Sequence, residues 1–378
     1  MGRLSGPVNL EEHYRGRSVL ITGHTGFKGS WLAEWLLLLG ARVTGYSLPP
    51  PTEPALFTQL GLRDRVAHVE ADIRQGDYLR RIMLETRPDF VFHLAAQSLV
   101  RPSYLQPKET YEVNVMGTIN VLEALRACKH PCAAVFITTD KCYEQKEAMD
   151  SYREGDALGG SDPYSSSKAA AEIAIASYRR SFLSQEGSQA AVASARAGNV
   201  VGGGDWAVDR IVPDCIRSLR SGTSVSIRNR LATRPWQHVL EPLSGYLELG
   251  AALTEKERKD IASAFNFGPP PGAEYSVLEL VEEVLRHWPG TWHDHPEQDA
   301  PHEAQHLRLA TDKALRLLGW FAAYDFQQTV KKTVDWYRES SSFASQDVES
   351  FIRITRQQIT DYQVARENLK PKTATHGA

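Results

Sequence analysis

Short apolar runs alternate with longer amphipathic stretches through the first half of the chain. Runs rich in valine, isoleucine, alanine and phenylalanine predict buried strands, and the stretches between them carry apolar residues at helical spacing. The strands are predicted at residues 18–22, 42–46, 65–70, 89–94, 133–138 and 191–195, and the helices at 28–39, 76–85, 110–127 and 165–181. This alternation indicates βαβ units. We therefore predict an α/β fold with a doubly wound parallel sheet and helices on both faces.

After residue 204 the alternation becomes irregular, and tryptophan, proline and arginine become frequent. A return strand is predicted at residues 263–267. The change in pattern predicts a Rossmann domain, which binds the cofactor, and a smaller C-terminal domain, which binds the substrate. The Rossmann domain is predicted at 15–204 with a return at about 236–268, the smaller domain at 205–235 and 269–345, and a C-terminal helix with a polar tail at 346–378.

Composition narrows the class of protein. The 378 residues carry a net charge of −3, with 42% apolar and 24% charged residues, which is ordinary for a globular protein. This balance argues against a general affinity for nucleic acid or anionic membranes. The N-terminus lacks the apolar core of a signal peptide, and the run at 31–39 is too short to span a bilayer. Four cysteines without C-x-x-C spacing are interpreted as reduced thiols of a cytoplasmic protein.

A glycine-rich turn links the first predicted strand to the first predicted helix. The string ITGHTGFKGSWL places glycines where the chain must turn tightly and where backbone must approach a pyrophosphate. Helix N-termini add N–H groups and the positive end of the helix dipole. In this context the turn predicts dinucleotide binding, although the spacing is G-x-x-G-x-x-G. The predicted contacts here are Gly23, Thr25, Gly26, Phe27, Lys28 and Gly29.

Further cofactor contacts are predicted where later strands end, because ligands of such sheets bind at the carboxyl ends of the strands. These residues are Asp72, Ile73, Leu94, Ala95, Ala96 and Thr138. One expected feature is missing. The second strand ends in Tyr46-Ser47, without the acid that would bind the adenosine ribose and repel a 2′-phosphate. This position therefore leaves both NAD and NADP open.

Two groups of polar residues predict acid–base chemistry. Tyr164 and Lys168 stand four residues apart at the start of a predicted helix, on one face. A free tyrosine has a pKa of about 10, and a nearby ammonium favours the phenolate. Thr139, Asp140 and Lys141 follow the fifth strand, where a hydroxyl, an acid and a potential base lie at the strand's carboxyl end. Together with the glycine turn, the two groups predict catalysis.

The strings GHTGFKGSWL, TTDKCYE, DPYSSSKAAAE, ARAGNVVGGGDW and RPWQHVLEPLSGY carry a family resemblance over residues 16–335. The chain resembles the extended short-chain dehydrogenase/reductases that act on nucleoside-diphosphate sugars. Among them it is most similar to the 4,6-dehydratases that act on CDP-glucose. Lysine at position 141 is the discriminating feature, because the dTDP-glucose dehydratases carry glutamate there. The resemblance implies NAD as cofactor, with Tyr164 and Lys168 at the nicotinamide ribose.

The resemblance also implies a three-stage hydro-lyase reaction that regenerates NAD. Tyr164, assisted by Thr139, takes the proton of the C4 hydroxyl while C4 is oxidised. Lys141 then removes the C5 proton and Asp140 protonates the departing C6 hydroxyl, after which C6 is reduced. The implied product is CDP-4-keto-6-deoxyglucose, a precursor in deoxysugar and O-antigen lipopolysaccharide biosynthesis. Lys141 must be neutral and Asp140 protonated for this chemistry. Because neighbouring groups titrate together, the division of roles between them stays open.

The substrate side is implied mainly by the resemblance. Arginine binds phosphate in a bidentate way, so Arg210 and Arg234 are candidate clamps for the diphosphate. The predicted substrate contacts are Gln97, Ser98, Asn199, Arg210, Arg234 and His302. Five histidines between residues 287 and 306 raise the question of a metal. We predict no metal site, because the histidines lie in a predicted loop rich in proline and acidic residues. No carboxylate–histidine helix motif accompanies them.

Several alternatives stay open. A nucleotide-sugar 4-epimerase of the same family would need Tyr164 and Lys168 but neither Asp140 nor Lys141. A protein that binds the cofactor without catalysis would need no acid–base set. The nucleotide base is not fixed by the residues themselves, so another nucleotide-sugar dehydratase also stays open. Family members typically dimerise, which implies a homodimer through the helices at 110–127 and 165–181.

Overall fold

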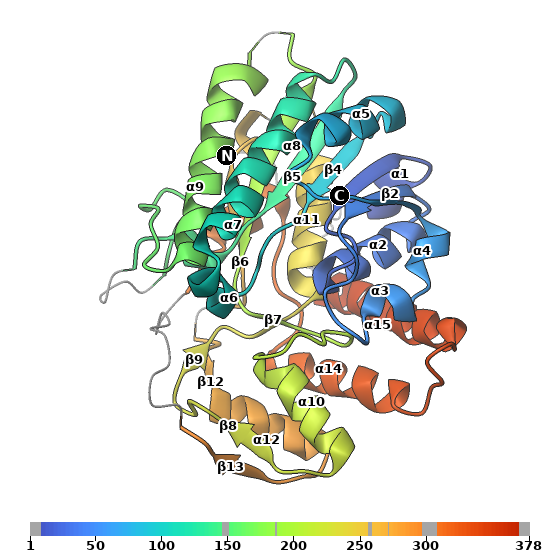
Figure 1. The fold of residues 1–378 in the computed structure, drawn as a ribbon, viewed down its shortest axis with the longest axis vertical. Helices are drawn as coiled ribbons and strands as arrows, with labels where there is room; N and C mark the ends of the chain where they lie inside the picture. Colours follow the sequence, from blue (N-terminus) through green and yellow to red (C-terminus); the bar gives the residue numbers. More distant parts are fainter. Residues whose placement is uncertain are drawn as a thin grey trace, which may run out of the picture.

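The computed structural model describes residues 9–145, 151–185, 187–255, 259–270, 272–296 and 308–369. Within them, seven parallel strands form one sheet in the order β11-β6-β5-β4-β1-β2-β3 (Figure 1). Their bounds are β1 Ser18–Thr22, β2 Arg42–Ser47, β3 Ala67–Glu70, β4 Phe90–His93, β5 Cys132–Ile137, β6 Ala190–Ala197 and β11 Ala264–Phe267. The predicted doubly wound sheet is confirmed, including the return strand, which pairs with β6.

Helices cover both faces because alternate strand residues are apolar in both directions. In β1, Val19 and Ile21 lie in a core with helices α2 and α11, whereas Leu20 lies in a second core with α5 and α8. One face carries α5 Gly76–Thr86, α8 Gly117–Arg126 and α9 Pro163–Tyr178. The other carries α1 Leu10–Tyr14, α2 Phe27–Leu38, α11 Leu240–Ala252 and α13 Asp312–Leu318.

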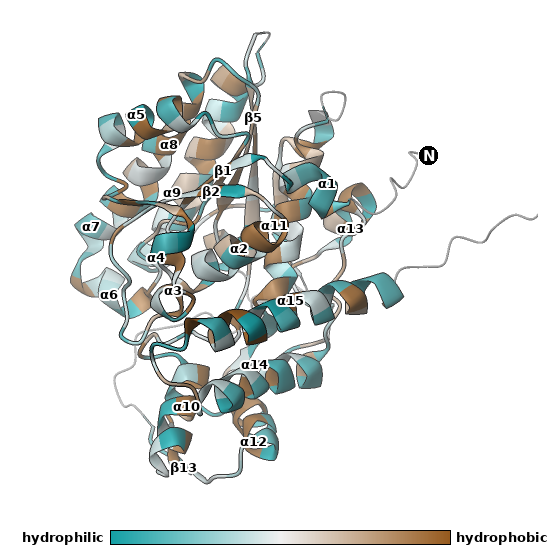
Figure 2. Cartoon of the chain, turned by 90° about the vertical axis from the view of Figure 1, so that its right-hand side faces the viewer, coloured by the Kyte–Doolittle hydropathy of each residue, from teal (hydrophilic) through white to brown (hydrophobic). Residues whose placement is uncertain are grey.

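The C-terminal helix α15 Val348–Leu369 packs against α2 and α14 Phe326–Ser340 (Figure 2). A smaller group of elements lies beyond the carboxyl ends of the strands (Figure 1). It contains β7 Val200–Val201, α10 Ile211–Ser221, β8 Val225–Ile227, β9 Thr233–Arg234, β10 Gln237–His238, β12 Tyr275–Ser276, α12 Val277–His287 and β13 Trp292–Asp294. The predicted domain boundaries stay a prediction, and the predicted polar tail beyond Leu369 lies outside the described residues.

Three local differences from the sequence predictions have physical causes. The third strand begins at Ala67, because residues before it form the short helix α4 Leu62–Arg65 after α3 Leu56–Gln59. The predicted helix at 110–127 is divided into α7 Pro107–Tyr111, the π-helical η1 Glu112–Met116 and α8. The helix at 165–181 likewise ends in a π-helical turn, η3 Arg179–Leu183. Wider turns of this kind are invisible to an apolar pattern read at 3.6 residues per turn. The remaining short elements are α6 Val100–Leu105, η2 Asp140–Cys142 and η4 Lys259–Ile261.

No helix among the described residues combines the length and the apolar character needed to cross a membrane. The four cysteines are all buried and unbridged. The described part of the chain also contains no group of three or more potential metal ligands. Of the five histidines considered above, His302 and His306 lie outside the described residues.

Candidate active site

The glycine turn follows β1 at the point where the strand order reverses, between β1 and β4. Gly23 has a φ of +78°, and a Cβ there would lie 2.7 Å from the Ala95 nitrogen. A Cβ on Gly29 would lie 2.1 Å from the Gly23 carbonyl oxygen. Only glycine fits at either position. Helix α2 starts directly after Gly26, and no side chain caps its N-terminus. The turn thus leaves a cradle of backbone N–H groups at the crevice where dinucleotides bind in such sheets.

The ends of β2 and β3 complete this side of the crevice. Thr25 hydrogen-bonds the Ser47 hydroxyl at 2.7 Å and the Leu48 carbonyl at 2.9 Å, at the position where the ribose-binding acid is missing. The carboxylate of Asp72 is held by Arg74 at 2.6 to 3.0 Å, and this contact lowers the pKa of Asp72. Asp72 is therefore an ionised carboxylate paired with Arg74, and its contact with the cofactor stays a prediction.

The loop after β4 is held by side chains of β1, α7 and η1 as well as by its own. Ala95 N–H donates to the Thr22 hydroxyl, and the Gln97 N–H donates to Asn114 at 2.9 Å. The Gln97 side chain bonds Leu99 and Thr110, so its amide lies within the loop, whereas Ser98 is exposed. Cofactor contacts at Ile73, Leu94, Ala95 and Ala96, and substrate contacts at Gln97 and Ser98, stay predictions.

The turn after β5 presents an incompletely paired acid. Residues 140–142 form the 3₁₀ turn η2, which Thr139 caps by accepting the Lys141 N–H at 3.3 Å. The Thr139 hydroxyl donates to Asp140 Oδ1 at 3.0 Å. Asp140 is 2% exposed, and within the described residues its Oδ2 has no hydrogen-bond partner. A buried acceptor left unsatisfied is costly, so such groups usually mark a place of function.

Helix α9 brings the phenol and the ammonium to the same place. Asp162 caps the helix by accepting the Ser165 N–H at 2.9 Å, and Pro163 occupies its first position. Tyr164 is buried, and both Thr139 and Asp140 act on the pKa of its phenol. The phenol therefore lies close to the hydroxyl and the acid of the turn. Lys168 is also buried, and its Nζ donates to the Ile137 carbonyl at 3.4 Å.

Burial shifts the pKa values of these groups toward their neutral forms. It raises the pKa of Asp140, while Lys141, Thr139 and Arg234 oppose the shift. It raises the pKa of Tyr164 to about 12, although the nearby Thr139 hydroxyl opposes the shift. It also lowers the pKa of Lys168 to about 8, against the opposing charge of Glu172. The direction for Asp140 is the one that a proton donor requires.

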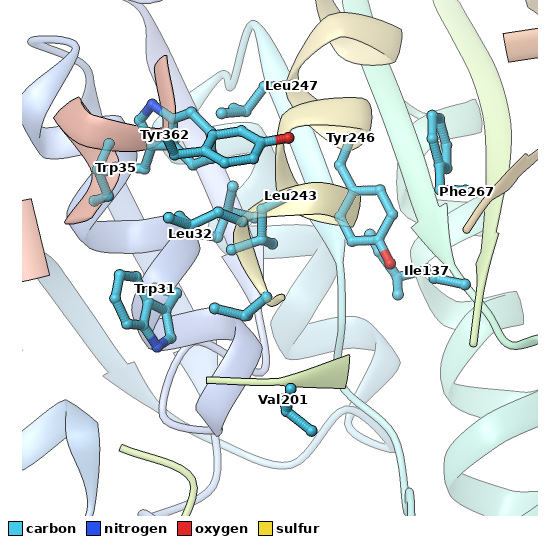
Figure 3. Close-up of a cluster of buried hydrophobic side chains, with 14 of the residues drawn as sticks. Trp31, Leu32, Trp35, Ile137, Val201, Leu243, Tyr246, Leu247, Phe267 and Tyr362 are labelled. Carbon is cyan, nitrogen blue, oxygen red and sulfur yellow. The ribbon is translucent and has the colours of Figure 1, made fainter. Parts of the chain in front are cut away.

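Lys28 lies closer to this cluster than the sequence indicated. Its Nζ donates to the Tyr246 hydroxyl at 3.0 Å, and Figure 3 shows that hydroxyl pointing toward Ile137 at the end of β5. Burial, together with the charges of Arg210 and Lys168, lowers the pKa of Lys28 to about 7. The Lys28 side chain is thus partly buried and lies near two other cations, Arg210 and Lys168.

The two candidate clamps flank the cluster. Arg210 donates to Asp205 at 2.9 Å and acts electrostatically on Tyr164, whereas Arg234 acts on Asp140. A Cβ on Gly198 would lie 2.8 Å from Asp140 Oδ2, which places the Gly198-Asn199 backbone beside the acid. Beyond Gly198 a small pocket is lined by Ser151, Pro235, Gly268, Pro269, Pro270, Glu274, Arg308 and Leu309. His302 lies outside the described residues.

A charged network beneath the turn escaped the sequence analysis. Glu172 and Arg196 form an ion pair at 2.8 Å, with side chains only 3% and 4% exposed. Arg196 donates to the Tyr143 hydroxyl at 2.7 Å, and Thr138 donates to Glu172 at 2.6 Å. One sequence signal pointed here, since Arg196 is a charge within a strand of alanines that must be buried.

The fold and the site define the class of protein. A doubly wound sheet with a glycine cradle at its crevice and a Tyr-x-x-x-Lys helix beside it is the arrangement of a short-chain dehydrogenase/reductase of the extended type. A family model described as GDP-mannose 4,6 dehydratase matches residues 20–333. The chain belongs to this family.

Individual relatives agree with the assignment. The CDP-glucose 4,6-dehydratase of Salmonella typhimurium is 42% identical over 357 residues, covering 93% of this chain and 98% of the relative. Among solved structures, dTDP-glucose 4,6-dehydratase from Bacillus anthracis in complex with NAD has a TM-score of 0.70 at 21% identity, covering 85% and 97% of the two chains. The UDP-glucose 4-epimerase of Thermus thermophilus in complex with NAD has a TM-score of 0.70 at 26% identity, covering 85% and 99%.

Proposed function

We propose that the protein is an NAD-dependent CDP-glucose 4,6-dehydratase, a hydro-lyase of deoxysugar biosynthesis. The observation that carries the proposal is the closeness of three side chains, because Thr139 bonds Asp140 and both residues act on the pKa of the Tyr164 phenol. A phenol and an acid that influence each other in this way face the same small volume, so both reach one hexose. An epimerase needs only the phenol there. The relative from Salmonella typhimurium supports the choice of CDP-glucose.

The cradle fits NAD. The backbone of Gly23, Gly26 and the first turn of α2 would hold the pyrophosphate, because a Cβ at Gly23 or Gly29 would collide with neighbouring backbone. Lys168 would hold the nicotinamide ribose. When bound, NAD accepts a hydride from sugar C4 and returns it to C6.

The residues of this chain would then move the protons. Tyr164 takes the C4 hydroxyl proton, and the charge that develops on the phenol is favoured by Lys168 and by the Thr139 hydroxyl. Asp140, whose pKa is raised by burial, donates a proton to the departing C6 hydroxyl through its unpartnered Oδ2. Lys141 removes the C5 proton, and a proton is restored at C5 when the hydride returns to C6. Arg210 and Arg234 flank this cluster and would bind the diphosphate.

The decisive experiment offers CDP-, dTDP-, UDP- and GDP-glucose, each labelled with deuterium at C4. We expect CDP-glucose to give the 4-keto-6-deoxy product, with the label at C6 and solvent hydrogen at C5. Label retained at C4 with inverted configuration would favour the epimerase and overturn the proposal. Preferred conversion of another nucleotide would keep the dehydratase and overturn only the substrate.

The division of roles between Asp140 and Lys141 has its own test. Lys141→Met should still oxidise C4 but block loss of water, because a thioether cannot accept the C5 proton. Accumulation of the 4-keto sugar that retains its C6 hydroxyl is the expected result. Dehydration at the normal rate would show that Lys141 is not the base.

We further propose a cytoplasmic homodimer. Its interface would form from α7, η1, α8 and α9, where Tyr111, Met116 and Ile173 are 39%, 51% and 56% exposed. Exposed apolar side chains on neighbouring helices are typical of an interface. Ile173→Glu should shift the mass in sedimentation to that of one chain. An unchanged mass would place the interface elsewhere.

A further inference from the structure

Two side chains that frame the catalytic turn are tied to one buried ion pair. Thr138 lies immediately before Thr139-Asp140-Lys141, and Tyr143 lies just after it. Thr138 donates to Glu172 Oε1 at 2.6 Å, and the Tyr143 hydroxyl accepts a hydrogen bond from Arg196 at 2.7 Å. Glu172 and Arg196 bond each other at 2.8 Å. A closed path thus runs from one end of the turn, through α9 and β6, to the other end.

The pair stays charged although it is buried. Burial raises the pKa of Glu172, but the Arg196 guanidinium and the hydrogen bonds from Thr138 and Ser194 outweigh it, so the pKa lies below its ordinary value. Burying a charged pair costs more than burying apolar residues of the same size, unless its geometry is well satisfied. Two of its outward bonds lead to the two ends of the turn, which points to a role in holding the turn.

Tyr143 is itself fixed in a definite orientation. Its hydroxyl donates to Asn266 at 2.7 Å, and its ring stacks on Tyr152 with centroids 4.9 Å apart. The Asn266 amide in turn donates to the Tyr152 carbonyl at 2.9 Å. The Arg196 guanidinium also lies 4.8 Å from the centre of the Tyr143 ring. The turn therefore ends on a side chain that cannot move without breaking bonds on three sides.

We propose that Glu172, Arg196 and Tyr143 are positioning residues for the dehydration stage, which hold Asp140 and Lys141 against the C5–C6 bond. The inference rests on the proposed function. Tyr164 is carried by helix α9, whereas Asp140 and Lys141 are carried by the turn. Loosening the Tyr143 end therefore displaces the dehydrating pair and leaves the phenol in place.

Tyr143→Phe tests this most sharply, because it keeps the stacked ring and removes only the hydroxyl. In a single turnover with NAD and CDP-glucose, reduced cofactor absorbs light after C4 oxidation and stops absorbing after the final reduction. We expect the absorbance to rise at the normal rate and to decay roughly 10-fold to 100-fold more slowly, the range for catalytic groups displaced by up to about an ångström.

Ser194→Ala is the matched control. Ser194 also donates to Glu172, at 2.8 Å, and lies on β6 two residues before Arg196, but its hydrogen bond does not lead to the turn. Its rise and decay should match those of the wild type within about twofold. A purely structural role predicts a smaller amplitude with unchanged time constants in both variants, and that result would overturn the inference.

Glu172→Gln provides a second variant that keeps the size of the side chain. Its decay should also lengthen, and the effect combined with Tyr143→Phe should be smaller than the product of the two, because both act through one turn. Fully multiplicative effects would overturn the inference. A wild type that converts no CDP-glucose in the same assay would overturn the proposed function, and the positioning role with it.

Discussion

The catalytic turn and the junction between α11 and the C-terminal helix each bury a carboxyl group, but they treat it differently. Asp140 receives one hydrogen bond, from Thr139, and its second oxygen has none within the described residues. Glu241 is fully buried and accepts from the Ala323 and Tyr324 N–H groups at 2.9 and 2.7 Å and from the Tyr362 hydroxyl at 2.7 Å.

The difference separates function from stability. Both oxygens of Glu241 already accept hydrogen bonds from the protein, so this carboxyl group is not available to a ligand. Its hydrogen bonds instead hold α15 and the segment before α14 against α11. The unpartnered oxygen of Asp140 would gain its partner from the substrate in the proposed reaction. Substitutions in the turn should therefore lower turnover and leave stability unchanged. Substitutions at the junction should lower stability and leave the turnover of the folded protein unchanged.

Tyr164→Phe should show the largest effect. Without the phenolic oxygen no base remains for the C4 hydroxyl, so turnover should fall on the order of 10⁴-fold, the upper end for general acid–base catalysis. The melting temperature should stay near that of the wild type. Tyr178→Phe, the same substitution at the far end of α9, is the control and should keep full turnover. Near-normal product formation by Tyr164→Phe would show that Tyr164 is not the base for the C4 hydroxyl.

Asp140→Asn should have the next largest effect and sharpens the comparison. Turnover should fall about 10³-fold because the amide cannot donate the proton that leaves with the C6 hydroxyl. Stability should rise or stay constant at neutral pH, since burial raises the pKa of Asp140 and its ionised form is therefore unfavourable in the folded protein. Calorimetry together with product analysis measures both. A marked loss of stability would assign Asp140 a structural role.

Sequence analysis reached those parts of the site that are local in the chain. The strand Ser18–Thr22 was predicted with its observed bounds, and Tyr164 and Lys168 were placed on one helix by their spacing. Contacts between distant segments were not accessible in this way. The bond from Arg196 to Tyr143 joins residues 53 apart in sequence, and no periodicity encodes it.

Loops were the other limit. The Gln97 amide is bonded to Leu99 in its own loop and to Thr110 of α7, which no pattern of residue types revealed. Lys28 was predicted as a cofactor contact, and that contact stays a prediction; its hydrogen bond to Tyr246, 218 residues away in sequence, was not accessible from the sequence. The contacts of both side chains depend on how distant segments pack against each other, and local sequence propensity carries no information about that packing.

Glu34→Ala tests the stability side of the comparison, at the contact between α2 and the C-terminal helix α15. Glu34 is fully buried in α2 and binds Arg65 at 2.6 Å and Arg356 of α15 at 2.7 Å. Removing it leaves two cations without their partner and should cost about 3 kcal/mol of unfolding free energy. Arg353→Ala is the control, one turn from Arg356 on α15. Its ion pair with Glu339 is exposed and should contribute less than about 1 kcal/mol. Urea unfolding measures both, and the turnover of folded Glu34→Ala should be normal.

The last effect is a pH dependence of stability that belongs to Glu241. Burial raises the pKa of Glu241 to about 7 from an ordinary value of 4.5, although its hydrogen bonds with Tyr362, Tyr324 and Ala323 oppose the shift. Between those values the carboxyl group is protonated in the folded protein and ionised in the unfolded chain. Stability should therefore fall by at most about 1.4 kcal/mol per pH unit as the pH rises through this window.

Glu241→Gln isolates this contribution, because glutamine does not titrate. The difference in unfolding free energy between wild type and variant should change with pH from about 4.5 to about 7 and be constant on either side. The other titrating groups cancel in the difference. If the difference is flat across the window, Glu241 is ionised in the folded protein, and its hydrogen bonds outweigh the cost of burial. Saturation by donors would then protect a buried charge outright, and the contrast with Asp140 would become one of charge as well as of partners.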